Sequence, residues 1–423
     1  MIDFEIPEAV KQQHQMSMAV AQSVMRPISR KFDEQEGETP WQYIKTMWPM
    51  IQAREQMEAM REAKRAAASE GGESASNGKA KPRIGNITNV FLIEALSWGD
   101  TGLYLITPSA GLGGEAVRAV GTPEQKKKYL YDWVQGEPKW GAMAITEAHA
   151  GSDTANIKTT ARLDPETNEW VLNGGKIFIT AGKMAGTIEG GYVVVWATID
   201  PNAGRAGIKP FIVPAGTPGF FVTKTEHKLG IRASDTAQLA FDECRIPYEN
   251  LLGSAEIVDK ESKKGFKGVM KTFDASRPAV AASAMGIARA AIEFTFAELE
   301  KQGHTLPVNK PRHQMTWVER QMVEIKALHK AAWLLTLRAA WMADMRLDNP
   351  VEASMCKAKA GTAVTKITQK CVELLGPLGY SRELLVEKWM RDAKINDLYE
   401  GTYQINLLIV ARRLLGYSRE QLK

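Results

Sequence analysis

Hydrophobic and polar positions divide the chain into three stretches of different texture. From Pro7 to about Tyr43, and again at 89–97 and 123–134, apolar residues recur every three or four positions, which predicts helices. From about Trp140 short runs rich in β-branched and aromatic residues alternate with turn residues, which is typical of antiparallel strands. Beyond Gly265 the helical spacing returns and continues to the end of the sequence.

These textures predict an α+β protein with three domains. We expect a helical domain at residues 1–138, a middle antiparallel β-barrel or sandwich domain at 139–255, and a four-helix domain at 256–423. Within the first domain, a charged helix and a Gly/Ser/Lys-rich stretch form an insert at about residues 51–85. Its composition favours a solvated helix and a flexible linker over a helix that binds a partner.

Composition narrows the class of protein. The 423 residues carry a net charge of +5 with basic and acidic residues interleaved, which does not favour nucleic acid but suits an anionic substrate such as a CoA thioester. Cys244, Cys356 and Cys371 lie in no metal-ligand spacing, so we expect no metal site and a reducing compartment. No apolar run approaches the roughly 20 residues of a membrane span. The acidic start lacks a targeting pattern, so we expect a cytoplasmic enzyme without membrane insertion.

Two motifs open the β region. In Ala144–Asp153, the Ala-Gly-Ser turn can offer backbone N–H groups and a hydroxyl to a phosphate, although an ordinary loop reads the same way. His149 within it has the pattern of a surface histidine. In Asn173–Thr180, strand alternation places Phe178 and Thr180 on one face. A ring beside a hydrogen-bonding group suits a flat heteroaromatic ligand, and an ordinary β core is the equal alternative.

Two further motifs lie near the C-terminus. One is Glu373–Tyr380, with the sequence ELLGPLGY, and the other is Tyr399–Ile405, with the sequence YEGTYQI. Glu400 in the second motif is flanked by Tyr and Gly between two helices, and a loop position allows its carboxylate to be aimed at a ligand.

These four segments, in this order and spacing, resemble the acyl-CoA dehydrogenase family over nearly the whole chain. The resemblance implies that family's fold of a helical domain, a β domain and a four-helix domain. It also implies FAD as cofactor and the α,β-desaturation of an acyl-CoA thioester. An electron-transferring flavoprotein would accept the electrons, and the expected assembly is a homotetramer or a heterotetramer.

The resemblance assigns roles residue by residue. Glu400 would remove the α-proton while flavin N5 takes the β-hydride, and its backbone N–H would help hold the enolate oxygen. Some members carry the base at the position of Ser276 instead. Arg232 belongs to a middle-domain motif without an assigned role. Flavin contacts are implied for Ile145, Thr146, Gly151, Ser152, Phe178, Thr180, Glu373, Gly376, Gly379, Thr402 and Gln404. Contacts with the acyl-CoA are implied for Phe273, Asp274, Arg277, Tyr399 and Gly401.

The sequence departs from the family pattern at three places. Around Gly303 the usual Arg-x-x-Phe-Gly element is missing, and Lys301, Lys310 or Arg312 are candidates to replace its arginine. Glu373 stands where the family has glutamine, which is unfavourable beside a pyrophosphate unless a cation intervenes. The Pro-Glu-x-x-Gly-Gly loop of the first domain is absent. These departures keep three alternatives open: a subunit of a heteromeric dehydrogenase with incomplete flavin contacts, a non-catalytic scaffold, and an acyl-CoA oxidase.

Overall fold

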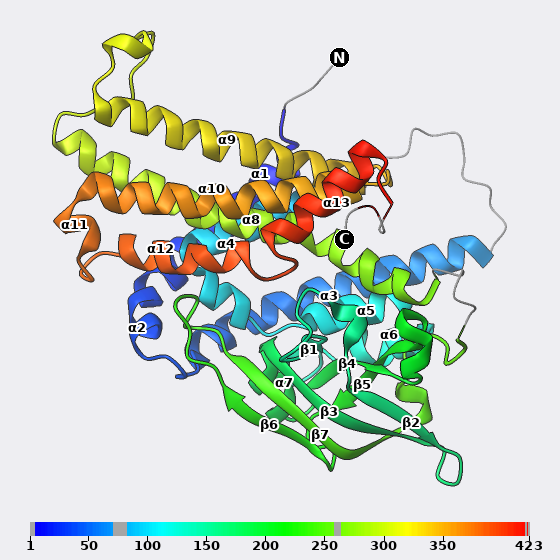
Figure 1. Ribbon diagram of the computed structural model, residues 1–423. Coiled ribbons are helices and arrows are strands. Elements are labelled where there is room, and N and C mark those ends of the chain that lie inside the picture. Colours follow the sequence, from blue (N-terminus) through cyan, green and yellow to red (C-terminus); the bar gives the residue numbers. More distant parts are fainter. Residues whose placement is uncertain (1–4, 71–82, 258–263, 419–420, 422–423) are drawn as a thin grey trace.

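The computed structural model describes residues 5–70, 83–257, 264–418 and 421, with side chains for all of these except 62–70 and 264–275. Long helices lie across the upper half of the molecule and the sheet forms the lower half, with the N-terminal helices beside and between them (Figure 1). The predicted order of helical, β and helical parts is confirmed. The helices before the sheet are α1 (Glu8–Val20), α2 (Ser29–Glu34), α3 (Trp41–Glu70), α4 (Gly85–Ile106), α5 (Gly111–Val120) and α6 (Pro123–Lys126).

The middle part is one curled sheet with the helix α7 (Gly182–Thr187) packed on it. Its strands are β1 (Gly141–Ala144), β2 (Thr160–Asp164), β3 (Glu169–Thr180), β4 (Tyr192–Thr198), β5 (Ile208–Pro214), β6 (Phe220–Thr225) and β7 (Thr236–Pro247). They are ordered β1-β4-β2-β3-β7-β6, and β5 pairs with β4. Most pairings are antiparallel as expected, but β4 pairs in parallel with both β1 and β2. The long connections from β1 and β2 to β4 allow this, because a parallel pair needs a crossover.

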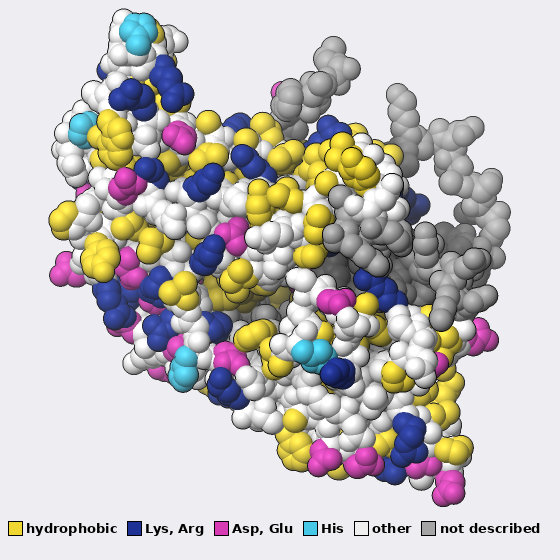
Figure 2. Space-filling model, in the orientation of Figure 1, with side chains coloured by type: hydrophobic (Ala, Val, Ile, Leu, Met, Phe, Trp, Pro, Cys, Tyr) yellow, Lys and Arg dark blue, Asp and Glu magenta, His cyan; other side chains and the backbone are white. Residues whose placement is uncertain are grey.

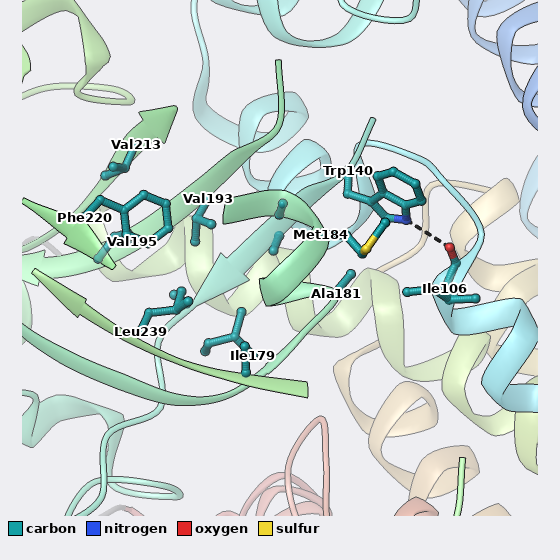
Figure 3. Packing of buried hydrophobic residues seen from close by; sticks show 14 of the residues in the cluster. Ile106, Trp140, Ile179, Ala181, Met184, Val193, Val195, Val213, Phe220 and Leu239 are labelled. Atoms are coloured by element: carbon teal, nitrogen blue, oxygen red, sulfur yellow. Dashed lines mark hydrogen bonds between the residues drawn. The ribbon is translucent and has the colours of Figure 1, made fainter. Parts of the chain in front are cut away.

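Apolar side chains from facing strands fill the space enclosed by the sheet (Figure 3). Val193 and Val195 of β4 lie near Leu239 of β7, and all three are almost completely buried. Trp140, just before β1, is 1% exposed and donates from its indole nitrogen to the Ile106 carbonyl at 2.9 Å. Because its polar atom is satisfied, this large side chain can be buried where α4 meets the sheet.

The C-terminal part consists of α8 (Lys264–Lys301), α9 (Trp317–Asp344), α10 (Pro350–Leu375), α11 (Pro377–Tyr380), α12 (Val386–Ala393) and α13 (Tyr403–Leu415). Buried alanines such as Ala284, Ala288 and Ala360 let α8 and α10 approach closely. Among the described residues, only the part of α8 at 276–301 is long and apolar enough to cross a membrane, and 67% of that window is buried inside the protein. It therefore serves as the core helix of this part.

A buried ionic cluster joins all three parts. Lys388 of α12 is 1% exposed and donates to Asp100 at 2.8 Å and to Asp392 at 2.5 Å. Asp100 interrupts α4 with an extended backbone and accepts from the Leu103 N–H, so it starts the second half of that helix. Asp392 also accepts from the Ile231 N–H in the loop before β7. Burial would lower the pKa of Lys388, but Asp100 and Asp392 raise it, so the lysine stays charged.

Arg232, in the same loop before β7, pairs with Glu36 just after α2 at 3.1 Å. The backbone N–H of Lys228 donates to the same carboxylate at 2.8 Å. The motif that carried no role in the sequence is therefore a docking element, because it fastens the β domain to the first helical domain.

Candidate active site

The loop between α12 and α13 holds Glu400 in a left-handed turn. Glu400 has φ 56° and Gly401 has φ 84°, so two consecutive residues occupy a region that costs a non-glycine residue roughly 1–2 kcal/mol. Asn406, fully buried on α13, donates from its side chain to the carbonyls of Gly401 and Thr402 at 2.9 and 3.0 Å. A Cβ at Gly401 would lie 3.2 Å from the Asn406 amide nitrogen. Glycine is required here by conformation and by space.

The Glu400 side chain is turned toward α8. Its Oε2 accepts a hydrogen bond from the Ser276 hydroxyl at 2.6 Å, so the structure brings together the two positions at which members of the resembled family carry their base. The residue as a whole is half-buried. Burial raises the pKa of Glu400, and the Ser276 hydroxyl and the charges of Arg277 and Lys357 act against that rise.

Arg277 and Lys357 are the cations next to this carboxyl group. Arg277 is 3% exposed and donates to the Ser354 hydroxyl at 3.2 Å. Lys357 is 1% exposed and donates to the Gly401 carbonyl at 2.5 Å. Burial lowers the pKa of Lys357 to about 8, against the opposing effect of Glu400 and Asp397. Arg277 is thus bonded to α10, and its expected contact with CoA stays a prediction.

Among the remaining residues expected to contact substrate, the structure describes the side chain of Tyr399 but not those of Phe273 and Asp274. The Tyr399 hydroxyl donates to the Asn396 side chain at 3.1 Å, and burial raises the pKa of Tyr399. The backbone of Phe273 and Asp274 belongs to α8, but their side chains lie outside the described residues. For these two, the sequence expectation stands as it was.

On the sheet side, the segment after β1 is fixed by a buried ion pair. Glu147 accepts hydrogen bonds from the Lys158 N–H, the Thr159 N–H, the Thr159 hydroxyl and Lys176 at 2.6 to 3.0 Å. Lys176 is fully buried and also donates to the Ile145 carbonyl at 3.1 Å. The carbonyl of Thr146 accepts from the N–H of residue 177 in β3 at 2.9 Å. The pair therefore holds Ile145 and Thr146 in a fixed position beside β3.

Phe178 has an unusual setting for an aromatic residue in a central strand. It has φ 60° and is 60% exposed, and the pairing of β3 with β7 shifts register between Lys176 and Ile179. This irregularity interrupts the simple alternation expected from sequence. It turns the Phe178 ring outward, while Thr180 at the end of β3 stays half-buried. A strained and exposed ring of this kind is an observation that points to a ligand.

The turn that follows Glu147 is exposed at Gly151 and Ser152, where backbone and hydroxyl groups face solvent. Within it, the His149 ring is hydrogen-bonded to the Asn156 carbonyl at 3.0 Å. His149 is exposed, as expected of a surface histidine, and its hydrogen bond also ties the two ends of this loop together.

Glu373, Gly376 and Gly379 lie at the opposite end of α10 from Lys357. Sixteen residues separate Lys357 from Glu373, which corresponds to about 24 Å along a helix. Within one chain these residues are therefore remote from Glu400. Glu373 pairs with Lys370 at 2.6 Å, so the sequence itself provides the cation that a glutamate beside a phosphate needs.

The hydroxyl of Thr402 caps α13 by accepting from the Ile405 N–H at 3.3 Å, and Gln404 in the first turn of that helix is exposed. Both positions lie within four residues of Glu400. Sequence reasoning missed Lys357 and Asn406. Lys357 follows Ala353 by four residues and precedes Ala360 by three, so a lysine on an apolar helix face was the available signal.

Comparison with known proteins decides what this site belongs to. Residues 142–244 match the model of the acyl-CoA dehydrogenase middle domain, and residues 263–415 match that of the acyl-CoA dehydrogenase C-terminal domain. Acryloyl-CoA reductase (NADH) of Anaerotignum propionicum is 37% identical over 313 residues, covering 74% of this chain and 74% of that protein. The short-chain specific acyl-CoA dehydrogenase of Clostridium acetobutylicum is 36% identical, covering 78% of this chain and 82% of that protein. The chain belongs to the acyl-CoA dehydrogenase family.

The structure agrees with this assignment. Butyryl-CoA dehydrogenase from Megasphaera elsdenii superposes with a TM-score of 0.79 at 29% identity, over 98% of this chain and 100% of that one. The protein is an acyl-CoA dehydrogenase, an FAD-dependent oxidoreductase acting on a CH–CH bond, as the resemblance predicted.

The residues present fit the flavin of FAD. Phe178 offers an exposed ring, and the half-buried Thr146 and Thr180 offer hydroxyl groups. The Thr146 carbonyl is bonded to β3 next to Phe178. The exposed Gly151 and Ser152 turn is open enough for a phosphate, since a Cβ added at Gly151 would meet nothing within 4 Å. These residues would hold the cofactor, and their individual contacts with it stay predictions.

Proposed function

We propose that Glu400 is the base of this acyl-CoA dehydrogenase and that it removes the α-proton of the acyl thioester. The observation that carries the proposal is the environment of its carboxyl group. Burial raises the pKa of Glu400, and the left-handed turn presents the carboxyl group beside the Ser276 hydroxyl. The thioester α-proton is weakly acidic, so a carboxylate near its ordinary pKa of about 4.3 is a poor base for it. A raised pKa brings the base closer to its task.

The other residues orient and protect the site. Phe178 and the hydroxyl groups of Thr146 and Thr180 would hold the FAD ring system, which supplies the acceptor for the β-hydride when bound. The backbone N–H of Glu400 is the group we assign to the developing enolate oxygen. A donor of this kind contributes about 3–4 kcal/mol to the transition state.

Anaerobic bleaching of the flavin absorbance tests this function. We expect the purified protein to be yellow and to bleach when an acyl-CoA is added, and the variant Glu400→Gln to stay yellow without bleaching. A variant that still bleaches would remove Glu400 from its role. A wild-type protein that binds FAD but is not bleached by any of the acyl-CoA thioesters would overturn the assigned reaction.

For the substrate, we propose a short-chain acyl-CoA. The support comes from relatives named short-chain specific and butyryl-CoA dehydrogenases. Bleaching rates measured with thioesters of increasing chain length would test this, and a maximum at long chains would contradict it.

For the assembly, we propose a tetramer of identical chains that passes electrons to an electron-transferring flavoprotein. Apolar side chains gather on the surface over α9 and α13 (Figure 2). On these two helices Leu334, Trp341, Leu407 and Leu408 are each at least 37% exposed. Exposed apolar surface of this extent is typical of a subunit interface. The separation of Glu373 from Glu400 along α10 also favours a second chain, whose cofactor the Glu373 region would contact.

Light scattering together with the ratio of flavin to protein tests the assembly. A colourless protein that gains flavin only beside a co-expressed partner would favour the heteromeric alternative. Rapid reoxidation of the reduced flavin by air would favour an oxidase. The three cysteines are buried and unpaired, which supports our proposal of a cytoplasmic location.

A further inference from the structure

A charged residue that no step of the reaction uses lies buried beneath the catalytic loop. Lys357 is in the second turn of α10, is 1% exposed, and is among the largest fully buried side chains of the described residues. A buried ammonium group is costly, and an apolar side chain of similar length would fill the same space without that cost. The presence of lysine therefore calls for something that its charge or its hydrogen bonds do.

The hydrogen bond of Lys357 is made to the catalytic loop itself. Its ammonium group donates to the Gly401 carbonyl at 2.5 Å, and the Asn406 amide donates to the same oxygen at 2.9 Å. Gly401 and Glu400 are the two residues with positive φ in the loop between α12 and α13. One carbonyl thus receives two donors from two different helices, α10 and α13, directly after the left-handed Glu400. Strain of this kind persists only where the surroundings determine the conformation.

The charge of Lys357 also faces the catalytic carboxyl group. The groups that act on Glu400 are Ser276 and Arg277 from α8 and Lys357 from α10, while the Tyr399 ring is its neighbour within the loop. Lys357 in turn senses Glu400, Asp397 and Arg277. Asp397 is already engaged by Lys394 at 3.0 Å and by Thr365 at 3.1 Å, so Glu400 is the acidic partner of Lys357 with the fewest competing contacts among the described residues.

We propose that Lys357 is a positioning residue for the reaction, which holds the left-handed turn of the catalytic loop through the Gly401 carbonyl and stabilises the ionised carboxylate of Glu400. This inference rests on the proposed role of Glu400. It gives Lys357 two effects that can be separated: a hydrogen bond that sets geometry, and a charge that sets the proton affinity of the base. Lys357 itself touches neither substrate nor cofactor in this scheme.

Four variants of the full-length flavoprotein test the proposal. Lys357→Met removes the charge and the donor, Lys357→Gln removes the charge alone, and Lys357→Arg keeps both. Lys366→Met makes the matched substitution at an exposed lysine of the same helix. The readout is the pH dependence of kcat/KM for flavin reduction by an acyl-CoA between about pH 5 and 9, whose acid limb reports the base of the free enzyme.

We expect the acid limb to move to higher pH by about one unit in Lys357→Met and in Lys357→Gln, because the carboxylate loses a nearby cation. Lys357→Met should lose more of kcat than Lys357→Gln, because it also loses the donor to Gly401. Lys357→Arg should restore the wild-type limb, and Lys366→Met should match the wild type throughout.

An unchanged acid limb with a rate lowered equally at every pH in the Met and Gln variants would overturn the proposal, since a purely structural lysine predicts that result. A limb that moves equally in Lys357→Arg would overturn it as well. If the Lys357→Met variant does not fold, the comparison of Lys357→Gln with Lys357→Arg still tests the proposal. Bleaching that persists in Glu400→Gln would instead refute the role of Glu400, so the two failures are distinguishable.

Discussion

Two glutamates on opposite sides of the site show how the same side chain acquires different chemistry. Glu147 lies beside the buried Lys176, and Glu400 lies near the buried Lys357, so each has a lysine whose pKa burial lowers to about 8. Their own pKa values nevertheless shift in opposite directions. Glu147 is held below the ordinary value, and Glu400 is raised above it.

The difference comes from the number of donors that reach each carboxylate. Burial alone would raise the pKa of Glu147, but Lys176, Thr159 and Lys158 supply four hydrogen bonds that stabilise its charge. Glu400 receives one described hydrogen bond, from Ser276, because Lys357 donates to a carbonyl next to it instead. A satisfied carboxylate is a structural anion, whereas an under-satisfied one can take a proton.

The largest expected effect separates the two glutamates by rate. Glu400→Gln should lower kcat/KM for flavin reduction by about a thousandfold or more, since a positioned base contributes roughly 10²–10⁴-fold. Stopped-flow measurement of bleaching gives this number. Glu383→Gln, at an exposed position, is the control and should keep the wild-type rate.

The second effect separates them by stability. Glu147→Gln leaves Lys176 buried without its counter-charge, and we expect a loss of about 3 kcal/mol in the free energy of unfolding together with weaker FAD retention. Urea unfolding of the apoprotein and the ratio of flavin to protein measure both. Glu166→Gln in the exposed turn after β2 should change neither, and a stable Glu147→Gln would break the contrast.

A smaller effect concerns the one donor to the catalytic carboxylate. Ser276→Ala should raise the pKa of Glu400 further and move the acid limb of the rate profile up by about one unit, because a hydrogen bond to a charged group contributes roughly 1.5 kcal/mol or more. Rates measured across pH should fall mainly on the acid side. Ser276→Thr, which keeps the hydroxyl group, should behave as the wild type, and an unmoved limb in Ser276→Ala would remove this bond from the account.

The smallest expected effect is on the pH dependence of stability. The lowered pKa of Glu147 gives stability that is present above its unfolded value of about 4.5 and is lost as pH falls through the folded value. The raised pKa of Glu400 has the opposite sign, because the fold loses stability as pH rises from about 4.5 through the folded value. The substitution Glu400→Gln removes this titrating group. It should therefore change the unfolding temperature of the apoprotein more favourably at neutral pH than at acid pH. A substitution that raises the unfolding temperature more at acid pH than at neutral pH would contradict the sign.

Sequence predicted the order of the three parts, because helical and strand periodicities differ along the chain. It also singled out Glu400 through the motif around it, and the role of that residue stays our proposal. It did not predict the parallel pairings of β4, which depend on long connections that leave no local signal. It also placed Phe178 by simple alternation, while a register shift against β7 sets the actual direction of the ring. The sequence did not indicate a role for Lys357, because its partner is a backbone carbonyl more than forty residues away and such a contact is created only by folding.

The hydrogen bond between Ser276 and Glu400 bears on how this family diversified. The resemblance implies that some members carry the base at the position of Ser276, whose hydroxyl here lies 2.6 Å from the Glu400 carboxylate. With Glu400 as the base that we propose, the base could change position without moving a helix. An intermediate with glutamate at both places would have to share a single proton between them, because two carboxylates this close cannot both ionise. In such a chain the acidity of the base would change although the helices that carry the two positions need not move.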